Sequence, residues 1–291
     1  PKMADLSSYP LIVVPVVLVF ALYGKLFFDL VTEGIPNLNW EILTTAYSTH
    51  PTMQAGLRNH LLGTLLLIGL TAAISLPVGV GAGLFISEYG GRLSSPVRFC
   101  ITSLRAMSVF LLGLAALSIV QHSEETMLSS AIQGANSTEG SFLTASIFLS
   151  LLVIPVISRA TEEGCRSLPT DQREGSAALG SSEGYTLTRL ILPWSLPNIV
   201  TGLLLGCAEA AGSLAVILFI AGQGDSGIGP FDQVTGLPLV LWGIQEDMSF
   251  RDTMAPYQYS AALLLMMITL SLSIAALFLR NRFSKRYRGA Q

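Results

Sequence analysis

Two charged side chains, Arg105 and Glu209, stand within long apolar segments and need a chemical explanation. A charge at the centre of a bilayer costs roughly 2.5–3.5 kcal/mol on insertion scales, so such residues usually face a cavity or each other. If the two pair or line a pathway, Arg105 could offer planar hydrogen bonds to an oxyanion, with Glu209 as its counter-ion. The alternative for Arg105 is a shallow position, from which its side chain reaches the cytoplasmic headgroups.

No arrangement typical of an enzyme is found in the sequence. The only Gly-Lys pair, Gly24-Lys25, lacks the upstream glycine of a nucleotide-binding loop, and the zinc-binding pattern HExxH does not occur. The three histidines are scattered, and the three cysteines lack the paired spacing of a zinc site or a disulfide framework. We therefore expect no catalytic residue, metal or cofactor on this chain, so any ATP and Mg²⁺ would be bound by a partner subunit.

A polar loop, Thr161 to Pro193, lies between two strongly apolar segments. Asp171, followed three residues later by Glu174, predicts the capped start of a short helix. Gly180 can take the left-handed conformation that ends such a helix. The loop is therefore expected to hold a helix and a sharp glycine turn.

A second helix is predicted after this turn. Ser181 or Ser182 can cap it, and it would run through Tyr185 into the next apolar segment. A loop with two helices pinned at the membrane surface suits a docking element better than a tether.

Composition indicates which elements must position these residues. Of the 291 residues, 51% are hydrophobic and 12% are charged, whereas about 25% are charged in a soluble domain. Six segments are long enough for a bilayer core, which needs about 20 residues. These are 9–30, 59–86, 99–121, 141–159, 190–221 and 257–280. We expect one all-α integral membrane domain over residues 1–291, and the net charge of −3 argues against a nucleic-acid partner.

The distribution of Lys and Arg predicts the orientation of the spans. With a cytoplasmic N-terminus, only Arg58 and Arg251 lie on the far side, and Lys25 and Arg105 lie within spans. The other twelve basic residues are cytoplasmic: Lys2, Arg92, Arg98, Arg159, Arg166, Arg173, Arg189, Arg280, Arg282, Lys285, Arg286 and Arg288. Both termini and the loop at 160–193 are therefore expected to be cytoplasmic.

The polar loop resembles the cytoplasmic motif of ABC importer permeases. That motif reads Glu-Ala-Ala, three residues, Gly, nine residues, Ile-x-Leu-Pro. Here Glu174-Gly175-Ser176 stands for the first three residues, Gly180 follows at the same distance, and Leu190, Leu192 and Pro193 complete the spacing. The resemblance implies an all-α, six-span permease of the type I (MetI-like) fold with cytoplasmic coupling helices, in the bacterial inner membrane.

In such a permease, a short helix parallel to the membrane seats in a groove of the ATPase and transmits its closure as a rigid-body motion. Glu174 would cap its own helix or pair with a basic residue of the partner. The resemblance assigns ATPase coupling to Asp171, Arg173, Glu174, Gly180, Ser182, Tyr185 and Pro193.

The match is closer to permeases of phosphate-specific ABC importers (the PstA/PstC type). Similar features include Gly56-Leu57-Arg58-Asn59, Ser87-Glu88-Tyr89, Thr161-Glu162-Glu163 and Leu237-Pro238, over about residues 50 to 280. Inorganic phosphate is therefore the leading substrate. The implied partners are a second permease subunit, two ATPase subunits, an external solute-binding protein and membrane lipid.

This sequence departs from that family at two places. Met107-Ser108-Val109-Phe110 stands where the family has a Pro-Ser-Ile-Val-like step. In the fifth span, Glu209 replaces a family arginine, and Ser213 replaces a family glutamate. The expected translocation pathway residues are Arg105, Ser108, Glu209 and Ser213.

Other functions remain open at this stage. The same architecture could carry another oxyanion or a different small solute. A non-transporting membrane scaffold or sensor could also dock an ATPase. A helix bundle that is closed by apolar residues, with no polar cavity, would favour that class. An ion-coupled secondary transporter is a third option, but it needs no docking motif for an ATPase.

Overall fold

The computed structural model describes residues 2–45, 56–89, 91, 93–122, 140–220, 229–246 and 251–288, which are almost entirely helical. The long helices are α1 (Lys2–Asn37), α3 (Arg58–Glu88), α7 (Phe142–Arg166), α10 (Leu192–Ala211) and α13 (Arg251–Arg288). The shorter ones are α2 (Trp40–Thr44), α4 (Ser94–Ala106), α5 (Val109–His122), α8 (Thr170–Ala178), α9 (Glu183–Thr186), the π-helix η2 (Leu187–Ile191), α11 (Leu214–Ile220) and α12 (Leu237–Glu246). One isolated antiparallel bridge joins Ser141 to Gln233.

Among the described residues, five helical stretches are long and apolar enough to cross a membrane. They are Val13–Asn37, Arg58–Glu88, Phe142–Arg166, Glu183–Ala211 and Tyr257–Arg282. A sixth crossing arises when α4 and α5, which are bent by 95° at their junction, are counted as one span. The count of six crossings therefore depends on this bent pair and stays a prediction.

The predicted span 99–121 contains two helices, α4 and α5, rather than one straight helix. The chain turns at Met107, whose backbone is extended, between the end of α4 and the start of α5. Ser108 begins the new helix, since its Oγ accepts a hydrogen bond from the N–H of Phe110 at 3.3 Å. A hydroxyl that satisfies a free N–H group allows a helix to start within an apolar stretch.

The predicted span 190–221 is also not one helix. It begins earlier, since α9, η2 and α10 form a continuous helical stretch over Glu183–Ala211. It then breaks at Gly212 and Ser213, and α11 follows as a separate helix packed against α5. The edge of the Phe110 ring meets the Phe219 ring, with centroids 4.9 Å apart, a favourable aromatic geometry.

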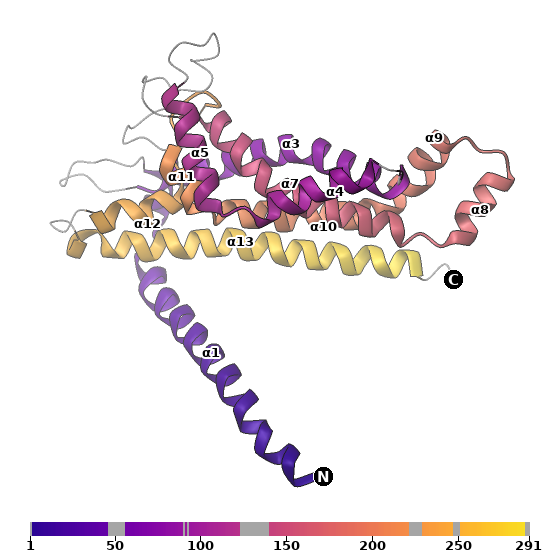
Figure 1. Ribbon diagram of the computed structural model, residues 1–291. Coiled ribbons are helices and arrows are strands. Elements are labelled where there is room, and N and C mark those ends of the chain that lie inside the picture. Colours follow the sequence, from indigo (N-terminus) through magenta and orange to yellow (C-terminus); the bar gives the residue numbers. More distant parts are fainter. Residues whose placement is uncertain are drawn as a thin grey trace.

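Helix α7 is the centre of the bundle, and 72% of its most apolar stretch is buried. It packs against α3, α4, α5, α10 and α11. Fully buried side chains of α7, such as Phe142, Leu149 and Ile157, join a core that continues through Leu67 of α3 and Ile217 of α11. Figure 1 shows α3, α7, α10 and α13 running along the same axis.

The contact between α3 and α7 is close enough to require glycine. A Cβ on Gly83 would lie 2.6 Å from the carbonyl oxygen of Ser158 and 2.6 Å from Cβ of Thr161. Small residues at such positions let the backbones of two helices approach each other closely. In a membrane, van der Waals packing rather than the hydrophobic effect holds helices together.

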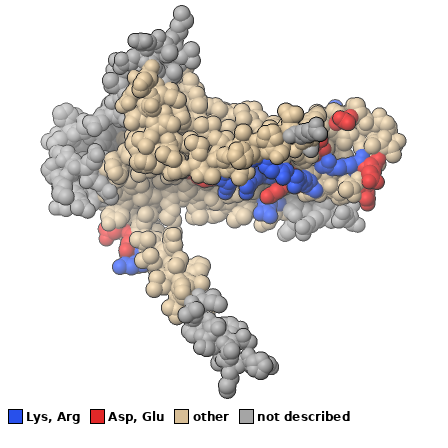
Figure 2. All heavy atoms as spheres, viewed as in Figure 1, with Lys and Arg blue, Asp and Glu red and all other residues tan. Residues whose placement is uncertain are grey.

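The two ends of the bundle differ. Helices α8 and α9 lie at one end with the C-terminal end of α13, and α11 and α12 lie toward the other (Figure 1). Blue and red atoms gather toward the α8 end, whereas most of the visible bundle surface is uncharged (Figure 2). Helix α1 meets α13 near Gly34, whose carbonyl accepts a hydrogen bond from Ser260, and projects away from the bundle.

Candidate functional site: the predicted coupling loop

The turn after α8 has the predicted glycine conformation. Gly180 has φ +77°, and it is the only residue with positive φ in the described part of the chain. Its N–H donates to the carbonyl of Ala177, and the N–H of Ser181 donates to the carbonyl of Ser176. These two bonds form a Schellman motif, which satisfies the last carbonyls of the helix.

The start of α8 differs from the prediction. The helix begins at Thr170, its N-cap is Pro169, and no side chain caps it. Asp171 therefore lies within the first turn, and the capping box of Asp171 and Glu174 is wrong. A carboxylate in the first turn still interacts favourably with the helix dipole, which accounts for an acidic residue here.

Ser182, and not Ser181, caps the second helix. Its Oγ accepts a hydrogen bond from the N–H of Tyr185 at 3.4 Å. Helix α9 continues through the π-helix η2 into α10, where Pro193 is the second residue. Because proline lacks an N–H, Pro193 cannot donate a hydrogen bond within this stretch, and it closely follows the π-turn. π-turns often occur at functional sites.

Side-chain hydrogen bonds stiffen the loop. The hydroxyls of Ser176 on α8 and Thr186 on α9 lie 2.8 Å apart. Trp194, in the first turn of α10, donates from Nε1 to Oγ of Ser167 at 3.1 Å. The two short helices are thus joined to each other, and the start of α10 is joined to the end of α7.

Arg173 connects the loop to two long helices. Its guanidinium donates two hydrogen bonds to the carboxylate of Glu88, at 2.9 and 3.0 Å, and one to the carbonyl oxygen of Cys165 at 2.7 Å. Glu88 is the last residue of α3, and Cys165 lies in the last turn of α7. A bidentate arginine–carboxylate pair fixes geometry as well as charge, so α8 is held at a set position on the bundle.

Glu88 was not predicted as part of this site. The sequence does contain a signal, because Glu88 ends a long helix and a negative charge at a helix C-terminus is unfavourable. Such a residue needs a cation nearby, and Arg173 supplies it across 85 positions of sequence.

Other predicted coupling residues project into solvent. Asp171, Glu174 and Tyr185 are exposed, and none of the ion pairs among the described residues involves either acid. Leu179, at the tip of α8, is 88% exposed. An apolar tip flanked by free carboxylates is a surface able to dock on a partner with an apolar groove and basic rim.

The four predicted pathway residues do not form one cluster of contacts. Arg105 and Glu209 are both exposed, and neither makes an ion pair with a described residue, so their predicted pairing is absent here. Ser108 caps α5. Ser213 lies at the break after α10, where its Oγ is buried without a hydrogen-bond partner among the described residues.

The chain is similar to curated permeases. It is 28% identical to a probable ABC transporter permease, YqgI, of Bacillus subtilis, over 70% of this chain and 66% of that protein, about two thirds of its length. It is 29% identical to the phosphate transport system permease protein PstA of Xylella fastidiosa, over 87% of this chain and 85% of that protein. It is 30% identical to the phosphate transport system permease protein PstA 2 of Mycobacterium bovis, over 83% and 76%.

Solved transporters share the fold. A bacterial alginate ABC transporter, in complex with an alginate-bound periplasmic protein, superposes over 98% of this chain and 97% of its own, with a TM-score of 0.66 at 14% identity. The inward-facing MetNI methionine ABC transporter covers 78% and 94%, with a TM-score of 0.57 at 19% identity. The described helices thus have the MetI-like, type I ABC permease fold, as the sequence predicted.

The family model for the binding-protein-dependent transport system inner membrane component matches residues 75–289. That range includes the coupling loop with its Schellman turn and the Arg173–Glu88 pair. The relatives are transport permeases rather than enzymes. This chain therefore belongs to the family of binding-protein-dependent transport system inner membrane components, and it is a multi-pass inner-membrane permease of the ABC importer class.

Proposed function

We propose that this permease carries inorganic phosphate, delivered by an external binding protein, into the cytoplasm by ATP-driven alternating access. The proposal of phosphate as the substrate rests on the similarity to phosphate permeases. The similarity to the Xylella fastidiosa protein extends over 87% of this chain. Another oxyanion or small solute in the same architecture is the alternative, because Glu209 and Ser213 depart from the phosphate-specific pattern.

ATP and Mg²⁺ would bind on two separate ATPase subunits, since this sequence lacks a phosphate-binding nucleotide loop. The exposed tip of the loop, with Glu174, Leu179 and Tyr185, would seat in a groove of one ATPase subunit. Closure of the ATPase pair would then displace α8 and α9. The coupling roles of Asp171 and Ser182 are, respectively, a charge at the docking face and a cap that keeps α9 folded.

The displacement has two routes into the bundle. One route is covalent, because α9 continues through η2 and Pro193 into α10 as one helical stretch. The other route is the contact of Arg173 with Glu88 and with the end of α7. Movement of packed helices as rigid bodies is a common way to transmit closure.

Both termini would lie in the cytoplasm with the coupling loop. The gathering of charged side chains near α8 (Figure 2) supports this orientation. A second permease subunit would complete the pathway, either a different chain or a second copy of this one.

The pathway would pass the breaks in the third and fifth predicted spans. Ser108 and Ser213 lie at these breaks, and Arg105 and Glu209 lie within a turn or so of them. Interrupted helices in transporters present backbone groups and polar side chains to a solute. The alternative for Arg105, contact with headgroups, remains open.

The test is ATP-dependent uptake of labelled phosphate by proteoliposomes that contain the complex and its binding protein. Uptake should be competed by unlabelled phosphate and not by excess sulfate. A Glu209→Gln variant should change the uptake rate, while the exposed Arg280→Gln on α13 serves as control. ATPase activity stimulated by the binding protein without phosphate uptake would reject phosphate and keep the importer.

A further inference from the structure

A cavity of about 270 Å³ lies where the ends of α3, α4 and α7 meet. It is lined by three arginines, two glutamates, two hydroxyl residues and two isoleucines: Arg98, Arg159, Arg166, Glu162, Glu163, Thr102, Ser158, Ile86 and Ile101. The five charged side chains sum to +3 − 2 = +1. The cavity is therefore a basic pocket at a helix junction, and none of the residues assigned to ATPase coupling or to the pathway lines it.

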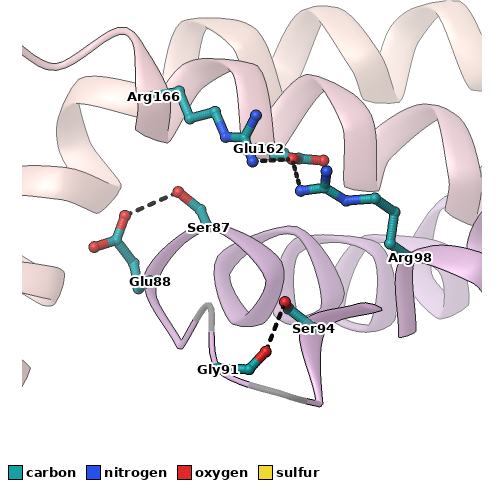
Figure 3. A network of polar contacts seen from close by, with 7 residues as sticks. All are labelled: Ser87, Glu88, Gly91, Ser94, Arg98, Glu162 and Arg166. Atoms are coloured by element: carbon teal, nitrogen blue, oxygen red, sulfur yellow. Dashed lines mark hydrogen bonds and ion pairs between the residues drawn. The ribbon is translucent and has the colours of Figure 1, made fainter. Parts of the chain in front are cut away.

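Glu162 positions two of the arginines. Its Oε1 accepts a hydrogen bond from Arg98 of α4 and forms an ion pair at 2.8 Å with Arg166, one turn further along α7. Figure 3 shows the Glu162 carboxylate between these two guanidinium groups. The Glu162 side chain is only 15% exposed, against 49% for Arg98 and 59% for Arg166. The carboxylate is thus the inner group, and both guanidinium groups lie outward of it.

These contacts leave most of the donors free for another group. Each guanidinium carries five N–H donors, and Arg98 and Arg166 each reach Glu162 through one terminal nitrogen. Arg159 also lines the cavity, and it makes no ion pair with any described carboxylate. Three guanidinium groups facing one cavity, with one of them unpaired, suit a ligand with several acceptor oxygens.

We infer that this cavity binds a phosphate group through Arg98, Arg159 and Arg166. Guanidinium groups match phosphate oxygens in charge and in planar bidentate geometry. Basic pockets between membrane helices on the cytoplasmic side are typical sites for phospholipid headgroups. The group is either the headgroup phosphate of an anionic lipid or free inorganic phosphate.

An exposed apolar side chain, next to Arg98 in the sequence, suits the lipid source. Phe99, which follows Arg98 on α4, is 72% exposed. A ring in that position can lie against an acyl chain while the neighbouring guanidinium meets the headgroup. Free phosphate would use the arginines alone and would not depend on Phe99.

The experiment uses the full chain purified in a mild detergent, with native mass spectrometry as the readout of bound molecules. Phosphatidylglycerol and the zwitterionic phosphatidylcholine are added in matched series. Retention of phosphatidylglycerol should exceed that of phosphatidylcholine. Arg159→Gln should weaken it about fivefold, the effect of about 1 kcal/mol per basic residue near a membrane surface. The matched control Arg280→Gln, an exposed arginine of α13, should leave retention unchanged.

Two further arms separate the sources and guard against misfolding. Free phosphate is identified as the ligand by either of two results. Inorganic phosphate binds to the chain, or it displaces phosphatidylglycerol under conditions in which sulfate does not. Loss of lipid retention in Phe99→Ala, with no effect of phosphate, identifies the headgroup. In Glu162→Gln the amide oxygen can still accept from Arg98 and Arg166 and so keep them in position, while the negative charge is removed. This variant should therefore retain the ligand at least as well as the parent chain.

Equal retention of both lipids by the parent chain and by Arg159→Gln, together with no binding of phosphate, would overturn the inference. The readout is binding by the isolated chain, so it does not depend on ATPase, binding protein or transported solute. Failure here leaves the proposed importer function intact, and failure of phosphate uptake leaves this pocket intact.

Discussion

Arg173 on the coupling loop and Glu88 at the end of α3 form a bidentate ion pair, at 2.9 and 3.0 Å, across 85 positions of sequence. The same guanidinium also donates to the carbonyl of Cys165 in α7. One side chain therefore links the loop between α7 and α10 to two helices of the bundle.

Removal of either partner of this pair should loosen α8. Arg173→Gln and Glu88→Gln should each reduce solute transported per ATP hydrolysed, while ATPase activity persists. Because the side chains are 31% and 15% exposed, we expect a coupling energy of about 1 kcal/mol in a double-mutant cycle of thermal unfolding. Strictly additive effects of the two changes on thermal unfolding would mean that the pair contributes nothing to stability.

Gly180→Ala should destabilise the loop by about 1 kcal/mol, because a Cβ is strained at φ +77°. No neighbour lies within 4 Å of the added Cβ, so strain alone accounts for the loss. Gly175→Ala is the matched control, since it lies within α8 and also has open space. It should stabilise the helix. Limited proteolysis of the loop compares the variants, and equal cleavage rates would contradict the prediction.

Gly83→Ala should weaken the packing of α3 on α7. The added Cβ would meet the carbonyl oxygen of Ser158 at 2.6 Å, and backbone cannot move aside as a flexible side chain can. We expect a loss of about 1–3 kcal/mol, typical of overpacking. Gly81→Ala, two residues earlier with nothing within 4 Å, should leave the melting temperature in detergent unchanged. A similar fall in both variants would point to loss of glycine itself and not to the close contact.

Arg105 and Glu209 should act independently in transport, because no ion pair joins them. In a cycle of Arg105→Gln, Glu209→Gln and the double variant, the coupling energy from phosphate uptake should stay below about 0.5 kcal/mol. A charge exchange between the two positions should not restore uptake. Recovery in the exchanged variant would establish a pair that forms in another state of the transport cycle.

Local rules predicted the coupling loop well. A left-handed glycine and a capping serine act within a few residues, so Gly180 and Ser182 could be placed from the sequence, and the family model and solved structures confirm the permease fold. The start of α8 was misjudged by a shift of two residues, which moved Asp171 from the cap into the first turn.

Non-local contacts could not be predicted in the same way. The pairing of Arg173 with Glu88, and of Glu162 with Arg98, depends on how the helix ends meet in space. The breaks at Ser108 and Ser213 were also missed, since hydropathy measures how apolar a segment is and does not report its bends.

The continuity of α9, η2 and α10 gives the permease a long rod. The stretch Glu183–Ala211 has 29 residues, which at about 1.5 Å per residue is about 40 Å, more than the thickness of a bilayer core. A tilt of about 5° at the loop would therefore displace the far end of this rod by about 3–4 Å. The helical stretch ends before Gly212, and α11 is a separate helix. Helix α11 therefore need not move with the far end of the rod. Small motions of the ATPase could thus become ångström-scale opening on the opposite side of the membrane without any change in the helix itself.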